Sequence, residues 1–171
     1  RPGRTRAWGR MEEARAAGLC RYVGVSNYDS ALLEELRASS ELLPAVNQIE
    51  FHPRFQARST IEACKRLGIA VMGYGSGISM GSPVVRRIAS ERGVSATQVA
   101  LRWVLQTGAA GIVRSSRRAG MAENLAAAGL PALSTGDMQA LRDIDDGQPF
   151  YWDTSALAAA DVWSKTAHPE F

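Results

Sequence analysis

The chain has 171 residues, of which 46% are hydrophobic and 22% charged, a composition typical of a globular domain with its own core. Its net charge of +3 is small, and no basic stripe carries interleaved aromatic residues, so the sequence predicts no nucleic-acid partner. The longest apolar run is far shorter than a bilayer requires, which predicts no membrane span.

The two cysteines, Cys20 and Cys64, show neither CxxC nor Cys/His spacing. We expect reduced thiols and no metal site. Reduced thiols are typical of a reducing compartment, which leaves the cytoplasm and organelles such as the mitochondrion open.

Four short apolar, β-branched runs predict strands at residues 21–25, 45–49, 69–72 and 110–113. Because polar and apolar residues do not alternate within them, we expect parallel strands covered on both faces. The segments between them show the apolar periodicity of amphipathic helices, and a last helix is expected from about 134 to 145. Trp8 and Trp103 occupy helical core positions and are expected to pack rather than to function.

Helix boundaries are also visible in the sequence. Ser59 with Glu62 and Ser95 with Gln98 have the spacing of capping boxes at helix N-termini. Ser82 followed by proline predicts another helix start. Three glycines follow helical runs, where a left-handed C-terminal cap is favoured: Gly68, Gly93 and Gly108.

The alternation of strands and helices predicts an α/β fold, either an open doubly wound sheet or part of a (β/α) barrel. No G-x-G-x-x-G motif follows a strand, since residues 73–77 have the wrong spacing and contain a tyrosine. This counts against a dinucleotide-binding doubly wound sheet. A full eight-unit barrel needs about 250 residues, so four strands suggest a partial one.

Five segments, in order and at matching spacing, resemble the aldo-keto reductase family: residues 24–28, 46–53, Tyr74, 98–103, and 112–115 with 123–125. The resemblance covers the family's strands five to eight, from about Trp8 to Asp145, and more loosely residues 151–153 and 168–171. It implies a partial (β/α)8 TIM barrel of about four parallel βα units plus extra helices over residues 1–147. A C-terminal tail, 148–171, follows.

The resemblance also implies an NADP(H) site. Ser26, Asn27 and Gln48 match the family's contacts to the nicotinamide carboxamide, and Tyr74 matches the ring that stacks on the nicotinamide. The remaining matches are to the phosphates and the adenine: Ser79 to the pyrophosphate, Arg114 and Ser115 to the 2′-phosphate, and Glu123 and Asn124 to the adenine.

Three departures from the family stand out. Its second 2′-phosphate arginine falls at Gly120, so NADP and NAD both remain candidate cofactors unless Arg117 or Arg118 reaches in. The loop after Tyr74 is rich in glycine. The family's catalytic Asp, Tyr, Lys and His lie on strands one to four, so no catalytic residue is expected here, and His52 matches a structural position.

Each matched residue also has a structural interpretation. Ser26 and Asn27 suit a turn and a helix cap, and Tyr74 suits a packed core ring. The cluster Arg114, Arg117 and Arg118 suits a solvated helix start, although three cations there oppose the helix dipole unless an anion binds. Loss of cofactor binding therefore stays open.

Four βα units cannot close a barrel, and their outer strands leave open edges. We therefore expect another polypeptide, a second copy or a large complex to cover those edges. Three hypotheses follow: a cofactor-binding half that reduces aldehydes or ketones once complemented, a catalytically inactive relative (a pseudoenzyme) serving as a structural subunit, or a truncated form of an ordinary enzyme.

Overall fold

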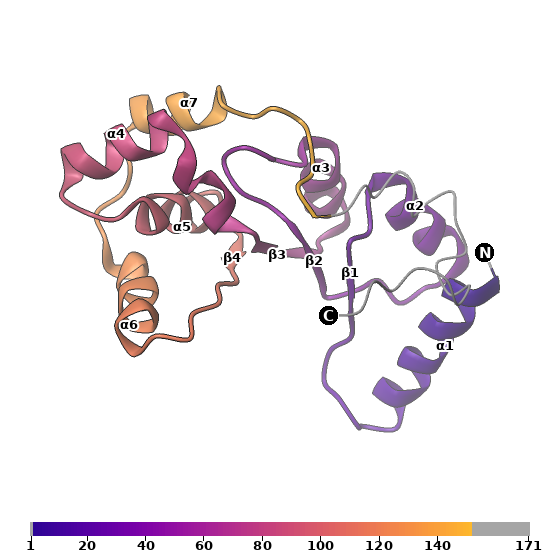
Figure 1. Cartoon of the computed structure of the whole chain (residues 1–171). Helices are drawn as coiled ribbons and strands as arrows, with labels where there is room; N and C mark the ends of the chain where they lie inside the picture. Colours follow the sequence, from indigo (N-terminus) through magenta and orange to yellow (C-terminus); the bar gives the residue numbers. More distant parts are fainter. Residues whose placement is uncertain (1, 152–171) are drawn as a thin grey trace.

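A computed structural model describes residues 2–151 and contains a four-stranded parallel sheet in the order β1-β2-β3-β4 (Figure 1). All four predicted strands are present, and the α/β class is confirmed. The strands are β1 (Gly24–Ser26), β2 (Val46–Glu50), β3 (Ala70–Tyr74) and β4 (Ala110–Gly111). The helices are α1 (Pro2–Ala16), α2 (Ser30–Ser39), α3 (Arg58–Leu67), α4 (Pro83–Arg92), α5 (Ala96–Gln106), α6 (Arg118–Ala126) and α7 (Thr135–Arg142), with two 3₁₀ turns, η1 (Ser76–Gly81) and η2 (Ala127–Gly129).

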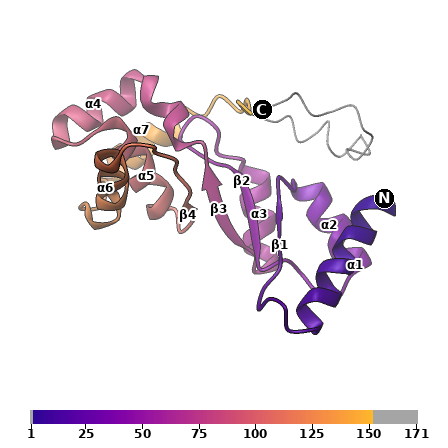
Figure 2. The same cartoon turned by 60° about the horizontal axis from the view of Figure 1, so that its bottom comes forward.

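The strands lie side by side with their carboxyl ends at one edge of the sheet (Figure 2). Gly24 pairs with Val46, and Val46 pairs in turn with Ala70. At the carboxyl edge Glu50 pairs with Tyr74. Residues that follow each strand are therefore brought together, as in other sheets built from βα units.

Hydrophobic packing joins the helices to one face of the sheet. Val25, Ile49 and Val71 belong to the clusters shared with the helices. Because side chains alternate along a strand, the in-register neighbours Ser26 and Gln48 point to the opposite face. Ser26 is exposed and Gln48 half-buried. Within the described residues, the predicted cover on both faces is thus found mainly on one.

The largest cluster lies between the sheet and α4, α5 and α7. Its centre is Trp103 of α5, whose ring lies 4.9 Å from that of Phe51. A smaller cluster around Trp8 fixes α1 against α2. Both tryptophans were expected to pack in the core, and their exposed fractions of 2% and 4% confirm it.

Most of the predicted helix boundaries are correct. Ser95 and Gln98 form the predicted capping box, and Pro83 begins α4. Gly68 and Gly93 adopt the left-handed conformation at the C-termini of α3 and α4. The last helix is shorter than expected, ending at Arg142 rather than near residue 145.

The predicted capping box of Ser59 and Glu62 is wrong. The helix begins at Arg58, and Ala57, in a left-handed conformation, occupies the cap position without a side-chain bond. Asp145, far along the chain, accepts hydrogen bonds from the Gln56 amide at 3.2 Å and from the Arg58 side chain at 2.9 Å. A tertiary contact with Asp145 therefore satisfies polar groups at the N-terminus of α3 in place of the serine cap that the sequence predicted.

Candidate functional site

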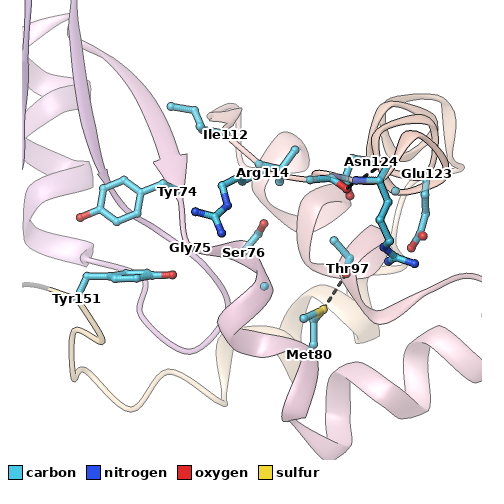
Figure 3. Close-up of a pocket in the computed structure, with 15 residues that line it drawn as sticks. Tyr74, Gly75, Ser76, Met80, Thr97, Ile112, Arg114, Glu123, Asn124 and Tyr151 are labelled. Carbon is cyan, nitrogen blue, oxygen red and sulfur yellow. Dashed lines mark hydrogen bonds between the residues drawn. The ribbon is translucent and has the colours of Figure 1, made fainter. Parts of the chain in front are cut away.

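A cavity of about 500 Å³ opens beyond the carboxyl ends of β3 and β4 (Figure 3). Its walls come from the end of β3, from η1, from the loop after β4 and from α6. Five of the nine residues predicted for the site line it: Tyr74, Arg114, Ser115, Glu123 and Asn124.

Three further predicted residues, on or directly after β1 and β2, do not line this cavity and are linked to it through Tyr74. Ser26 donates to the carbonyl of its register partner Gln48 at 3.0 Å, and the Asn27 amide donates to the same carbonyl at 2.9 Å. The Asn27 side-chain oxygen accepts a hydrogen bond of 2.8 Å from the hydroxyl of Tyr74. Asn27 has a positive φ of 59°, a conformation that asparagine tolerates better than most residues.

Tyr74 is half-buried, and its surroundings favour the protonated, neutral form of its hydroxyl. Burial, followed by the negative charge of Glu50, raises the pKa of Tyr74 to about 12. The hydrogen bond to Asn27 acts in the opposite direction and is outweighed. At neutral pH the residue is therefore a neutral aromatic ring with a fixed hydroxyl, suited to stacking rather than to proton transfer.

Two arginines make part of the cavity wall cationic. Arg114 lies between Tyr74 and α6, with its guanidinium group on the Tyr74 side (Figure 3). Arg117 also lines the cavity, and no ion pair recorded within residues 2–151 uses either arginine. Ser115 shapes the turn into α6: its hydroxyl accepts from the Arg117 backbone amide at 3.2 Å and donates to the Arg117 carbonyl at 3.1 Å. This cationic part of the cavity can receive an anion.

Gly120 determines the shape of that cationic part of the cavity. A Cβ atom at this position would lie 2.5 Å from the Ser115 hydroxyl oxygen and 3.9 Å from an Arg117 guanidinium nitrogen. Any side chain there would push Ser115 aside, and the Arg117 guanidinium already lies next to the space left open. The sequence offers Arg117 and Arg118 as candidates to replace the family's second 2′-phosphate arginine. Of the two, only Arg117 lines the cavity.

Ser79 does not line the cavity. It lies inside η1 with none of its surface exposed, and its hydroxyl is 3.4 Å from Nδ1 of His52. Ser76, one turn earlier, lines the cavity instead. The glycine-rich sequence gives no periodic signal that separates the environments of the two serines.

Other lining residues carried no signal in the sequence. Met80 and Thr97 are joined by a contact of 2.8 Å between the threonine hydroxyl and the sulfur, and form one wall. Tyr151, which follows the last helix, lies at the same end of the cavity as Tyr74 (Figure 3). Its aromatic side chain was the available hint, but its position depends on tertiary contacts.

His52, which the sequence assigned to a structural position, lies buried beside the site. His52 is 1% exposed, and its Nε2 lies 3.0 Å from a Glu50 carboxylate oxygen. Its other nitrogen is 3.2 Å from the Phe55 amide, so the imidazole has structural partners on both sides. Residues 2–151 also contain no group of three or more side chains arranged to hold a metal ion, and no helix among them could span a bilayer.

A parallel βα sheet with helices on one face and an anion-receiving cavity at its carboxyl edge defines part of a (β/α) barrel with a candidate nucleotide site. The model of the aldo/keto reductase family matches residues 4–82 and 79–146. The chain therefore belongs to the aldo/keto reductase family.

Relatives in sequence agree with this assignment. The chain is 38% identical to D-galacturonate reductase of Fragaria ananassa over 128 residues, which is 69% of this chain and 40% of that protein. It is 40% identical over the same share of each chain to NADPH-dependent codeinone reductase 1-2 of Papaver somniferum. The chain thus spans well under half the length of these relatives.

Solved structures agree on the fold. Gox0644 in its apo form superposes with a TM-score of 0.80 at 32% identity, covering 85% of this chain and 55% of that one. The aldose reductase of Schistosoma japonicum superposes with a TM-score of 0.82 at 23% identity. The match covers 96% of this chain and 55% of the reductase. The four βα units are therefore about half of a TIM barrel, as predicted.

Proposed function

We propose that the chain is the NADP(H)-binding half of an aldo-keto reductase, which reduces a carbonyl substrate once the rest of the barrel is present. The observation that carries the proposal is one cavity lined both by the Tyr74 ring and by Arg114 and Arg117, which form no recorded ion pair within residues 2–151. A reduced nicotinamide dinucleotide carries a flat neutral ring and phosphate groups, so an aromatic ring and available cations in one cavity suit it. One similar protein is by name NADPH-dependent.

At the nicotinamide end, the existing hydrogen bonds leave suitable groups free. Tyr74 uses the Asn27 side-chain oxygen, so the Asn27 nitrogen remains to donate to the carboxamide oxygen. The Ser26 hydroxyl donates to Gln48, so its lone pairs remain to accept from the carboxamide nitrogen. The Gln48 side chain supplies a further amide, and Tyr74 supplies the ring face.

At the phosphate end, Arg114, Ser115 and Arg117 would hold the 2′-phosphate. Two guanidinium groups can offer paired donors to phosphate oxygens, and the hollow beside Gly120 gives the phosphate room. Glu123 and Asn124, on the following turn of α6, would contact the adenine. Ser76 takes the pyrophosphate role first assigned to Ser79, because Ser76 lines the cavity.

When bound, the cofactor supplies the hydride. In this proposal the proton comes from a group outside the described residues. The place for the rest of the barrel is the open edge of the sheet. Beside β4 a second hollow of about 500 Å³ is lined mainly by apolar side chains, including Leu101, Leu105 and Leu125. Leu125 is 78% exposed and needs such cover.

The alternative is a catalytically inactive subunit that uses the same edge for assembly. The apolar hollow beside β4 favours it, because assembly alone would account for that surface. The two functions differ in whether the cavity still binds a dinucleotide.

The deciding experiment titrates the purified chain with NADPH and with NADH and follows tryptophan fluorescence. We expect NADPH to bind more tightly. Arg117→Ala should weaken NADPH about tenfold and leave NADH nearly unchanged, because a charged hydrogen bond to the 2′-phosphate contributes about 1.5–3 kcal/mol. Arg21→Ala, which removes an equal charge outside the cavity, is the control. If neither dinucleotide binds, the cofactor proposal is wrong and the structural alternative stands.

A further inference from the structure

The carboxylate of Glu50 is used in an unusual way at the end of β2. The residue is 4% exposed, and each of its oxygens accepts one backbone amide, from Phe150 at 2.7 Å and from Tyr151 at 2.9 Å. One oxygen also lies 3.0 Å from Nε2 of His52. A buried carboxylate is costly unless it is fully hydrogen-bonded. Here the bonds reach a segment 100 residues away in sequence.

That segment, residues 145–151, is called the strap below. Its first residues are tied to the start of α3 and to the loop before it, because Asp145 pairs with Arg58 at 2.9 Å and Asp146 pairs with Arg54 at 2.6 Å. Its last residues are tied to β2 through Glu50. The strap is therefore fixed at both ends along the carboxyl edge of the sheet.

The strap places the Tyr151 ring against that of Tyr74. Their centroids are 5.7 Å apart with an interplanar angle of 64°, an edge-to-face contact. Figure 3 shows Tyr74 broadside and Tyr151 nearly edge-on beside it. Gly75 permits this approach: a Cβ there would lie 3.3 Å from the Tyr151 ring and 3.1 Å from His52, at a φ of +85°.

We infer that Glu50 and Tyr151 are positioning residues for the aromatic platform of the cofactor site. Glu50 pins the strap, the strap holds the Tyr151 ring, and that ring together with Asn27 fixes the plane of Tyr74. Glu50 acts through Tyr151 and does not touch the cofactor. This inference rests on the proposed role of Tyr74 as the surface on which the nicotinamide stacks.

The claim that Glu50 holds the strap and that Tyr151 orders the Tyr74 ring can be tested without any cofactor. Glu50→Gln keeps the size of the side chain but cannot accept both amides, so hydrogen exchange at the Phe150 and Tyr151 amides should become about tenfold faster. The Tyr74 ring resonances should broaden or shift in Tyr151→Leu, which leaves the Glu50 charge beside Tyr74 in place. Glu62→Gln, an exposed glutamate of α3, and Tyr22→Leu, an exposed tyrosine, are matched controls and should leave both signals unchanged. Unchanged exchange in Glu50→Gln would overturn the inference.

The functional part uses a double-mutant cycle on NADPH affinity. Because the two residues act in series, Glu50→Gln and Tyr151→Leu should each weaken NADPH by about fivefold, and the double variant should be no weaker than the worse single one. Additive losses, or full affinity in both single variants, would contradict the inference. If the unchanged chain does not bind NADPH at all, the proposed function fails, and the exchange and Tyr74 signals still decide whether Glu50 and Tyr151 order the ring.

Discussion

Tyr74 shows how burial and a neighbouring charge alter one side chain. Since the folded chain raises its pKa from 10.0 to about 12, the stability gained from the neutral phenol is complete below pH 10.0 and is lost as the pH rises toward 12. We expect Tyr74 to ionise in this late range. The ultraviolet absorbance of tyrosinate, followed against pH, measures this.

The assignment needs a difference measurement because burial also raises the pKa of Tyr28. The titration of Tyr74→Phe, subtracted from that of the unchanged chain, should leave one late step. A step at the ordinary tyrosine pKa would show that the ring is more accessible than the structure implies.

At this scale the sequence brought forward residues whose positions only the structure gives. Tyr74, Arg114 and Asn124 line the cavity, and their contacts to a cofactor stay a prediction. Ser79 is buried within η1 against His52. The sequence shows that Gly120 lacks the side chain that the family has at this position. Only the structure shows that the Arg117 guanidinium group lies beside the space that this side chain would fill.

The contact between β1 and β2 leaves no room for a side chain at Gly24. A Cβ there would lie 2.4 Å from a Val46 methyl carbon and 2.8 Å from the Val46 carbonyl oxygen. The backbone oxygen cannot move without breaking the ladder. Gly24→Ala should therefore destabilise the fold by about 1–3 kcal/mol, measured by urea unfolding.

Gly9 is the matched control, since nothing lies within 4 Å of the position its Cβ would occupy in α1. Gly9→Ala should stabilise the chain by up to about 1 kcal/mol, because alanine favours a helix interior. Equal stability of the two variants would show that β1 is not packed as described.

Helices show which local signals are reliable. The box of Ser95 and Gln98 formed because both residues lie within the same turn and need no distant partner. The box of Ser59 and Glu62 failed because Asp145, supplied by the segment after α7, satisfies the earlier residues Gln56 and Arg58. Spacing alone cannot foresee a competing tertiary partner.

The whole molecule has an open sheet with apolar groups beside its β4 edge. Leu125 and Met121 are 78% and 52% exposed there, next to the hollow beside β4. Uncovered strand edges and apolar surface promote association. We expect the isolated chain to self-associate, and Leu125→Lys to reduce this in sedimentation experiments.

Met11→Lys is the control, because Met11 is 41% exposed on α1, an element that takes no part in this edge. It should leave association unchanged. A monodisperse monomer of the unchanged chain would contradict the prediction that the open edges require a partner.

By itself, the sequence determined the family, the parallel βα order and the positions of the strands, because these follow from short segments of characteristic residues and spacing. The tertiary structure decided which face of the sheet is covered, that Ser76 rather than Ser79 faces the cavity, and that Glu50 holds the strap beside Tyr74. These features join residues as many as 100 positions apart. Such long-range contacts leave no periodic trace in a single sequence, so only the folded chain reveals them.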